Sequence, residues 1–214
     1  MLADDPVLMA MFPLGTVLFP QQLLPLQVFE PRYRSMMADV LSGARGLLPA
    51  CFGVTLIERG SEVGGGDVRS RYGCVAQIVQ TDQLADGRIA VVAAGIERIE
   101  VVDWLPDDPY PLARCLRIVD ECCDAALADA AVARALALLT EVHATIGCAF
   151  DAGQWPSDVG AFADAIAYRF GFGAFDAHRV LREVGPLERL DLACAVLTDA
   201  LDDARLRRSI QGEG

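Results

Sequence analysis

Glu30, Arg32 and Tyr33 form the most distinctive polar cluster in the sequence. A carboxylate, a guanidinium and a phenol so close together could bind a polypeptide through ion pairs and hydrogen bonds. The same side chains could instead be structural, with Glu30 and Arg32 tying a helix to nearby strands and Tyr33 packing beneath. We favour the structural interpretation, because charged residues are seldom buried unless they are paired.

Five large apolar residues around the same segment could form an exposed groove for an extended polypeptide. They are Phe12, Phe19, Leu24, Leu26 and Phe29. Packing in a core is the favoured alternative, since large apolar side chains usually lie inside a protein. The candidate polypeptide-binding residues are therefore these five together with Glu30, Arg32 and Tyr33.

The composition removes several kinds of catalytic site. The chain has no lysine and no asparagine, so all 18 basic residues are arginine. This excludes a P-loop lysine, a Schiff base, a Ser-Lys dyad and a Cys-His-Asn triad. The run Gly64-Gly65-Gly66 joins two strand-like segments and is followed by no lysine, so it is not a phosphate loop. We therefore predict no catalytic residue and a protein that is not an enzyme.

The metal-binding residue types show no recognisable spacing. The seven cysteines include no C-x-x-C pair, and His143 and His178 are the only histidines. Zinc sites need several ligands at set spacings, so we predict no metal and no cofactor. Reduced, mostly buried thiols are expected instead.

The charge and the apolar pattern restrict partners and location. The net charge of −12 disfavours nucleic-acid binding, because the chain repels phosphate backbones. The acidic start lacks the positive charge of a secretory signal, and no apolar run is long enough to cross a membrane. We expect a cytoplasmic protein with no membrane or nucleic-acid partner; the oligomeric state is left open.

The elements that would position the candidate residues change character near Asp120. Before it, short alternating segments bounded by turn residues predict strands at 24–29, 48–58, 73–81, 88–94, 98–104 and 112–119. Gly95 is expected to break one run, and a helix is expected over 31–41. Strands in meander order with one early helix predict a small barrel or pseudobarrel over residues 1–120.

After this point, apolar residues recur at helical spacing and predict a bundle over residues 121–214. Helices are expected over 126–146, then from Ser157 or Asp158 to Phe170. Asp176 is expected to cap a shorter helix, and Pro186 to begin the last one. The predicted class is α+β, a β pseudobarrel followed by an α-helical bundle.

One string in the β half is specific. Phe12-Pro13-Leu14-Gly15-Thr16-Val17-Leu18-Phe19-Pro20 precedes Leu24-Pro25-Leu26-Gln27-Val28-Phe29-Glu30-Pro31-Arg32-Tyr33, which resembles the opening signature of the Lon protease substrate-binding domain family. Later landmarks follow in order, including Gly73-Cys74-Val75-Ala76-Gln77-Ile78, Asp86-Gly87-Arg88 and Gly95-Ile96-Glu97-Arg98. The match covers about residues 11–118, and position 74 departs from the usual threonine.

The resemblance implies a PUA-like pseudobarrel with a helical bundle, acting as a stand-alone relative without ATPase or peptidase. It implies partners that are unfolded or degron-bearing polypeptides. The chain would serve as an adaptor or holder, alone or together with a separate protease. Two alternatives stay open. One is an RNA-binding PUA-like protein, and the other is a small-molecule-binding or hydrolytic protein that uses the cleft between the subdomains.

Overall fold

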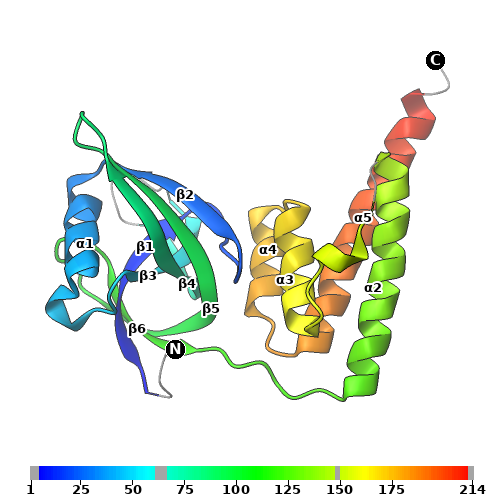
Figure 1. Ribbon diagram of the computed structural model, residues 1–214, viewed down its shortest axis with the longest axis horizontal. Helices are drawn as coiled ribbons and strands as arrows, with labels where there is room; N and C mark the ends of the chain where they lie inside the picture. Colours follow the sequence, from blue (N-terminus) through cyan, green and yellow to red (C-terminus); the bar gives the residue numbers. More distant parts are fainter. Residues whose placement is uncertain (1–4, 61–66, 148–149, 212–214) are drawn as a thin grey trace. The chain divides into compact units, whose positions relative to one another are not determined.

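The computed structural model describes residues 5–60, 67–147 and 150–211, with the backbone alone for 208–211. The chain divides into two compact units, Met1–Val119 and Asp120–Gly214, and each is considered by itself (Figure 1). The glycine run at 64–66 and Cys148 lie outside the described residues.

Unit 1 is a barrel built from one six-stranded sheet (Figure 1). Its strands are β1 (Val7–Leu14), β2 (Leu23–Val28), β3 (Cys51–Arg59), β4 (Val68–Gln83), β5 (Ile89–Leu105) and β6 (Leu112–Arg117). The order is β2-β5-β4-β3-β1-β6, and a further pairing of β5 with β6 closes five strands into a ring. The long strand β5 pairs with two strands along one edge, with β2 through residues 89–94 and with β6 through residues 99–105. The sixth strand, β2, therefore extends the sheet beyond the ring.

Two glycines allow backbone segments to approach closely inside this barrel. A Cβ atom added to Gly73 would collide with the carbonyl oxygen of Val54. One added to Gly95 would collide with the carbonyl oxygen of Phe19, which itself accepts a hydrogen bond from Gln22 N at 3.2 Å. Glycine is needed at both positions because any side chain would push the neighbouring backbone segment away.

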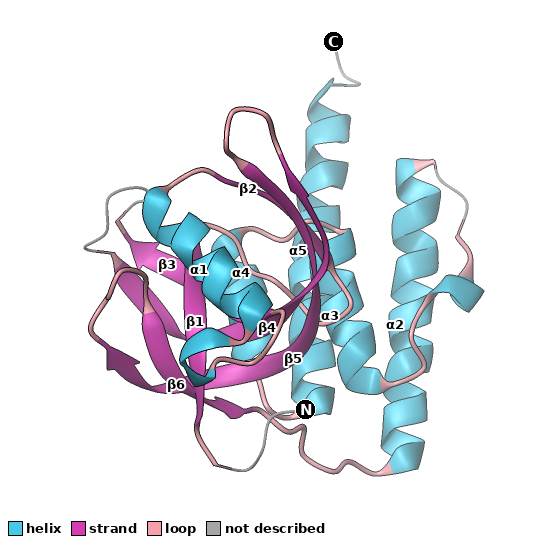
Figure 2. Ribbon diagram, turned by 60° about the vertical axis from the view of Figure 1, so that its left-hand side comes forward, coloured by secondary structure: helices cyan, strands magenta, loops and turns pink. Residues whose placement is uncertain are grey.

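Helix α1 (Pro31–Ser42) completes the core of unit 1 by packing on β1 and β3 (Figure 2). Pro31 occupies the first turn, where its missing N–H is not needed, and Gly43 ends the helix with a φ of 67°. The buried face carries four apolar side chains, those of Tyr33, Met36, Met37 and Val40. They join the β-strand residues in one cluster with Phe12 and Phe52.

Unit 2 is a helical bundle (Figure 1). Its helices are α2 (Ala125–Ile146), α3 (Val159–Arg169), α4 (Ala174–Arg182) and α5 (Pro186–Gln211), with a short 3-10 turn, η2, at Ala152–Gln154. Helices α2, α3 and α4 all contact α5. Asp124 and Asp158 cap α2 and α3, since their carboxylates accept backbone N–H groups of the first turns. The expected class, a β pseudobarrel followed by a helical bundle, is confirmed.

Three local expectations were wrong. Strand β5 continues through Gly95, because glycine there accommodates a close neighbour rather than ending the strand. The strands do not form a simple meander: β1 lies between β3 and β6 and runs parallel to β3. Helix α4 begins after Gly173, which places Asp176 inside its first turn rather than at its cap.

Candidate functional site

Strand β2 leaves one edge of the sheet open. Within the described residues it pairs only with β5, and Gly95 N donates to Gln22 O at 2.9 Å. Because backbone direction alternates along an antiparallel ladder, this bond fixes which residues face β5 and which face away. Leu23, Pro25 and Gln27 direct their backbone groups away from β5. Pro25 has no N–H to donate, as expected for an edge position.

Strand β1 borders the same opening from the other side. Met11 N donates to Pro111 O at 2.9 Å, so this side of β1 is paired up to Met11. Pro13 follows with the same backbone direction, beyond the residues that pair with β6. Proline again presents a carbonyl and no N–H. Within the described part of the chain β1 and β2 form no ladder, so the barrel wall is split between them.

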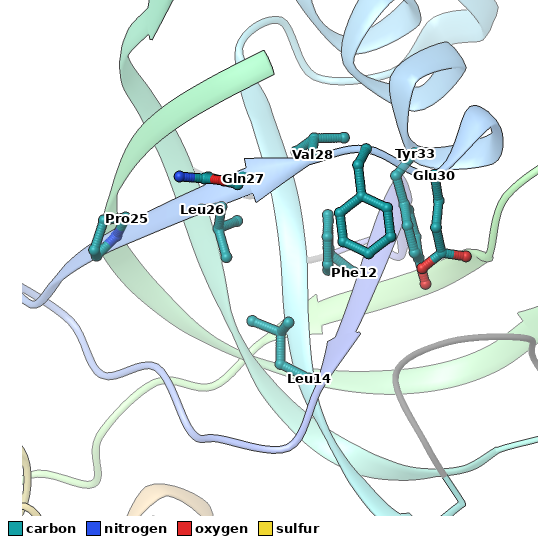
Figure 3. A pocket seen from close by; sticks show the side chains of 9 residues that line it. Phe12, Leu14, Pro25, Leu26, Gln27, Val28, Glu30 and Tyr33 are labelled. Carbon is teal, nitrogen blue, oxygen red and sulfur yellow. The ribbon is translucent and has the colours of Figure 1, made fainter. Parts of the chain in front are cut away.

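A pocket of about 220 Å³ lies at this split (Figure 3). We call it the split pocket. Phe12 and Leu14 approach it from β1, and Leu26 faces them from β2. Its lining residues are Phe12, Leu14, Pro25, Leu26, Gln27, Val28, Phe29, Glu30 and Tyr33. The Phe29 side chain is 56% exposed, so an apolar group is available to a partner at the mouth.

The aromatic rings of Phe12 and Tyr33 pack together at the pocket. Their centroids are 4.2 Å apart with an angle of 14° between the planes, and Phe52 packs on Phe12 at 6.1 Å. Burial raises the pKa of Tyr33 to about 12, so its hydroxyl is neutral at physiological pH. The wall here is aromatic and uncharged.

The polar cluster predicted from the sequence is mainly an internal network. Arg32 Nε lies 3.0 Å from Glu30 Oε2, and the guanidinium sits 4.5 Å above the Tyr33 ring. Glu30 lines the pocket while Arg32 does not. This ion pair joins two residues at the start of α1 and does not itself tie the helix to a strand, whereas the Tyr33 side chain is buried in the core.

A second arginine network continues beside it. Arg69 Nη2 lies 2.7 Å from Asp107 Oδ2, and its Nε lies 2.7 Å from Asp67 Oδ2. Burial tends to raise the pKa of Asp67, but hydrogen bonding to Arg69 outweighs it and the pKa falls below its usual value. The Arg69 guanidinium also lies 5.0 Å from the Trp104 ring centre. This network was not predicted from the sequence, because Trp104 and Asp107 are far along the chain from Asp67 and Arg69.

The structure brings five of the eight candidate residues together. Phe12, Leu26, Phe29, Glu30 and Tyr33 line the split pocket. Phe19 and Leu24 are 1% and 9% exposed and lie in the core, which is the alternative that the sequence analysis favoured, so they belong to no exposed groove. Leu14, Pro25, Gln27 and Val28 also line the pocket but were not predicted from the sequence. Alternation along β2 and the two prolines were the available signals.

Unit 2 contains a larger pocket of about 410 Å³ between α5 and the α3–α4 region. Its lining includes the apolar residues Phe170, Phe172 and Leu197 and the acidic residues Asp199 and Asp203.

Among the described residues no three histidine, cysteine or acidic side chains gather as metal ligands. His143, one of the two histidines considered as metal ligands, directs Nδ1 to Leu139 O at 2.7 Å and packs on Phe170.

No described helix is long and apolar enough to cross a membrane.

The thiols are less buried than expected. Cys74 and Cys115 are buried, Cys51 and Cys194 are partly buried, and the neighbours Cys122 and Cys123 are exposed. All six are free.

The family model of the substrate-binding domain of ATP-dependent protease La (LON) matches residues 9–199. The chain belongs to this family. The match spans both units, so the helical half belongs to the family domain as well as the barrel that carried the sequence resemblance.

Curated relatives are full Lon proteases. The Lon protease of Dictyoglomus thermophilum is 26% identical over 221 residues, which cover 98% of this chain and 26% of the relative. Lon protease 2 of Herpetosiphon aurantiacus is 27% identical over 207 residues, covering 94% and 24%. The chain therefore spans about a quarter of the length of these relatives.

Solved structures show the same fold. A Lon N-terminal domain protein from Xanthomonas campestris superposes with a TM-score of 0.61 at 22% identity, covering 88% of this chain and 98% of the other. The N-terminal domain of Mycobacterium avium complex Lon protease gives 0.66 at 16% identity, covering 90% and 98%.

Proposed function

We propose that this chain binds polypeptides without chemistry on them, and that the split pocket of unit 1 takes an apolar part of the partner. The partners would be unfolded or degron-bearing proteins, which the chain holds or presents to a protease. The observation that carries this proposal is the exposed Phe29 beside an apolar pocket in a member of the Lon substrate-binding family.

The dimensions of the pocket support a side chain as its occupant. Pockets for drug-sized ligands and cofactors typically occupy about 300–1,000 Å³, whereas the split pocket measures about 220 Å³. Its lining includes one carboxylate, Glu30, and no basic residue. Such a lining offers little to a phosphate group, and the net charge of −12 also opposes RNA binding.

Fluorescence anisotropy tests the proposal. A labelled polypeptide kept unfolded by carboxymethylation is titrated with the protein at low and at high salt. We expect saturable binding that survives high salt, because burial of apolar surface is not screened. Retention of RNA that is lost with salt would favour the RNA-binding alternative instead.

Two phenylalanine variants locate the site. Phe29→Ala removes the exposed ring at the pocket and should weaken binding by at least about tenfold, since burial of such a side chain contributes roughly 1.5–3 kcal/mol. Phe175→Ala is the matched control, because Phe175 is 75% exposed on α4 in unit 2 and lines neither pocket. Equal affinity of both variants and the unmodified protein would show that the split pocket is not the site.

A further inference from the structure

We propose that the partner polypeptide binds as an added β-strand on the open edge of β2, with alternate side chains entering the split pocket. This inference rests on the proposed function, since it specifies the conformation in which a polypeptide occupies that same pocket.

The backbone of β2 provides the pairing groups. Leu23 and Gln27 each turn an N–H and a carbonyl away from β5, and Pro25 between them turns a carbonyl. An extended segment alongside would supply matching donors and acceptors at the same spacing, which is how strand addition achieves affinity without a particular sequence. Neither a compact ligand nor a helix offers this pattern, because a helix satisfies its own backbone groups.

The side-chain directions along β2 are also consistent with an added strand. Leu24, Leu26 and Val28 point towards the core face, and Leu26 and Val28 line the pocket. An added strand continues the same alternation, so every second side chain of the partner would lie over Leu26 and Leu14. The remaining side chains would lie on the outer face, level with Leu23, which is 61% exposed.

The two prolines select the occupant. Pro13 and Pro25 face the opening from opposite sides, and both offer only carbonyls. A partner strand brings N–H groups that can donate to the carbonyls of these two prolines. A second copy of this chain pairing through its own β2 would bring another proline to the middle of the contact, where donors are missing. A client polypeptide is therefore the better occupant, and Pro25 limits the pairing to a short, reversible ladder.

A pair of substitutions at one position isolates the backbone contribution. Gln27→Pro removes the outward N–H, whereas Gln27→Ala removes the same side chain, with its 2.7 Å bond from Arg88, and keeps the N–H. Relative to Gln27→Ala, we expect Gln27→Pro to bind the carboxymethylated polypeptide about tenfold more weakly, because a pairing donor is lost and an acceptor is stranded. Circular dichroism verifies that both variants are folded. Equal affinity of the two folded variants would overturn strand pairing while leaving polypeptide binding in place.

A second measurement uses the unmodified protein, so it stands even if Gln27→Pro does not fold. The probe is a short labelled peptide in which valine and threonine alternate, N-methylated either at every valine or at every threonine. In an added strand the amides of one residue type face β2 and those of the other face away, so only one methylated peptide should lose binding. Equal binding of both, or no binding of the unmethylated peptide by protein that binds the carboxymethylated polypeptide, would overturn the inference. Failure to bind either probe would remove the proposed function as well.

Discussion

Phe12 and Tyr33 stack face to face, with ring centres 4.2 Å apart, although one belongs to β1 and the other to the first turn of α1. The stack fixes α1 on the barrel at the point where the wall is split. Tyr33 is 4% exposed and Phe12 8%, so both rings belong to the core while their edges line the pocket. The family's most characteristic segment therefore has a structural role, to which our proposal adds a binding role.

Removal of the Tyr33 ring should destabilise unit 1. We expect Tyr33→Ala to cost about 3–5 kcal/mol in the free energy of unfolding, as for other large aromatic residues in a core. Tyr33→Phe preserves the ring and should change it by less than about 1 kcal/mol. Urea unfolding followed by Trp104 fluorescence, with Trp155 replaced by phenylalanine, reports on unit 1 alone. A similar cost for both variants would show that the hydroxyl, rather than the stack, matters.

Alkaline pH should destabilise unit 1 through its buried tyrosines. Burial raises the pKa of Tyr33 and that of Tyr110 from 10.0 to about 12. The folded protein holds these protons where the unfolded chain has lost them, so the stabilisation is fully present below pH 10 and is lost as the pH rises through 12. Tyr33→Phe removes one of the two contributions and should flatten the fall in unfolding free energy above pH 10. An unchanged pH profile in this variant would contradict the assignment to Tyr33.

Much of the barrel could be predicted because its signals are local. The Pro31 start and the Gly43 end of α1 follow from backbone geometry, and the alternation in β2 and β5 follows from one buried face. The pairing of β1 between β3 and β6 could not be predicted, because it joins residues such as Met9 and Ala113 that are far apart in the chain. Gly95 was misread because its cause is tertiary, the nearby carbonyl of Phe19.

The candidate site was predicted only in part, because local signals identify residue types whereas burial depends on the tertiary structure. Composition and family resemblance placed attention on residues 12–33, and the structure places five of the eight candidates at one pocket. Burial decides the other members: Phe19 has the same residue type as Phe29, yet one is 1% exposed and the other 56%. Sequence reveals residue type and alternation, but which face of a short strand lies at a split in the wall depends on strand order.

A buried ion pair should hold the start of unit 2 to its last helix. The Arg189 guanidinium, on a side chain 1% exposed, contacts both carboxylate oxygens of Asp120 at 2.9 and 2.6 Å, and its Nε lies 3.4 Å from Asp164. Arg189→Met leaves Asp164 buried without its arginine and should cost about 3–5 kcal/mol. Asp120→Asn should cost only about 1 kcal/mol, since the Asp120 side chain is 36% exposed and screened by solvent.

The measurement for these variants is urea unfolding followed by Trp155, with Trp104 replaced by phenylalanine. Strict additivity in the double variant Arg189→Met with Asp120→Asn would show that the two side chains do not interact, contrary to the structure.

Gly95→Ala should destabilise unit 1, although alanine is normally the better residue inside a strand by up to about 1 kcal/mol. The added methyl group would meet the carbonyl oxygen of Phe19 and lie 3.2 Å from Cys74 Sγ. Because the Phe19 carbonyl belongs to the backbone, the strain cannot be relieved by a side-chain rotation, and we expect a cost above about 2 kcal/mol. Gly173→Ala is the control, since nothing lies near its added methyl group and its φ is −57°. The measurement is urea unfolding of unit 1, followed by Trp104 fluorescence. A urea midpoint for Gly95→Ala equal to that of the control would refute the close approach.

Thiol labelling should distinguish the two exposed cysteines from the core. Cys122 and Cys123 are exposed, whereas Cys115 is fully buried and burial raises its pKa to about 12. Only the thiolate reacts with iodoacetamide, so Cys115 is protected both by access and by protonation. We expect native protein at mildly alkaline pH to be alkylated first at Cys122 and Cys123, and at Cys74 and Cys115 only when unit 1 unfolds in urea. Peptide mapping by mass spectrometry assigns each site, and alkylation of Cys115 in native protein at the rate of Cys122 would mean that the barrel opens far more often than its packing indicates.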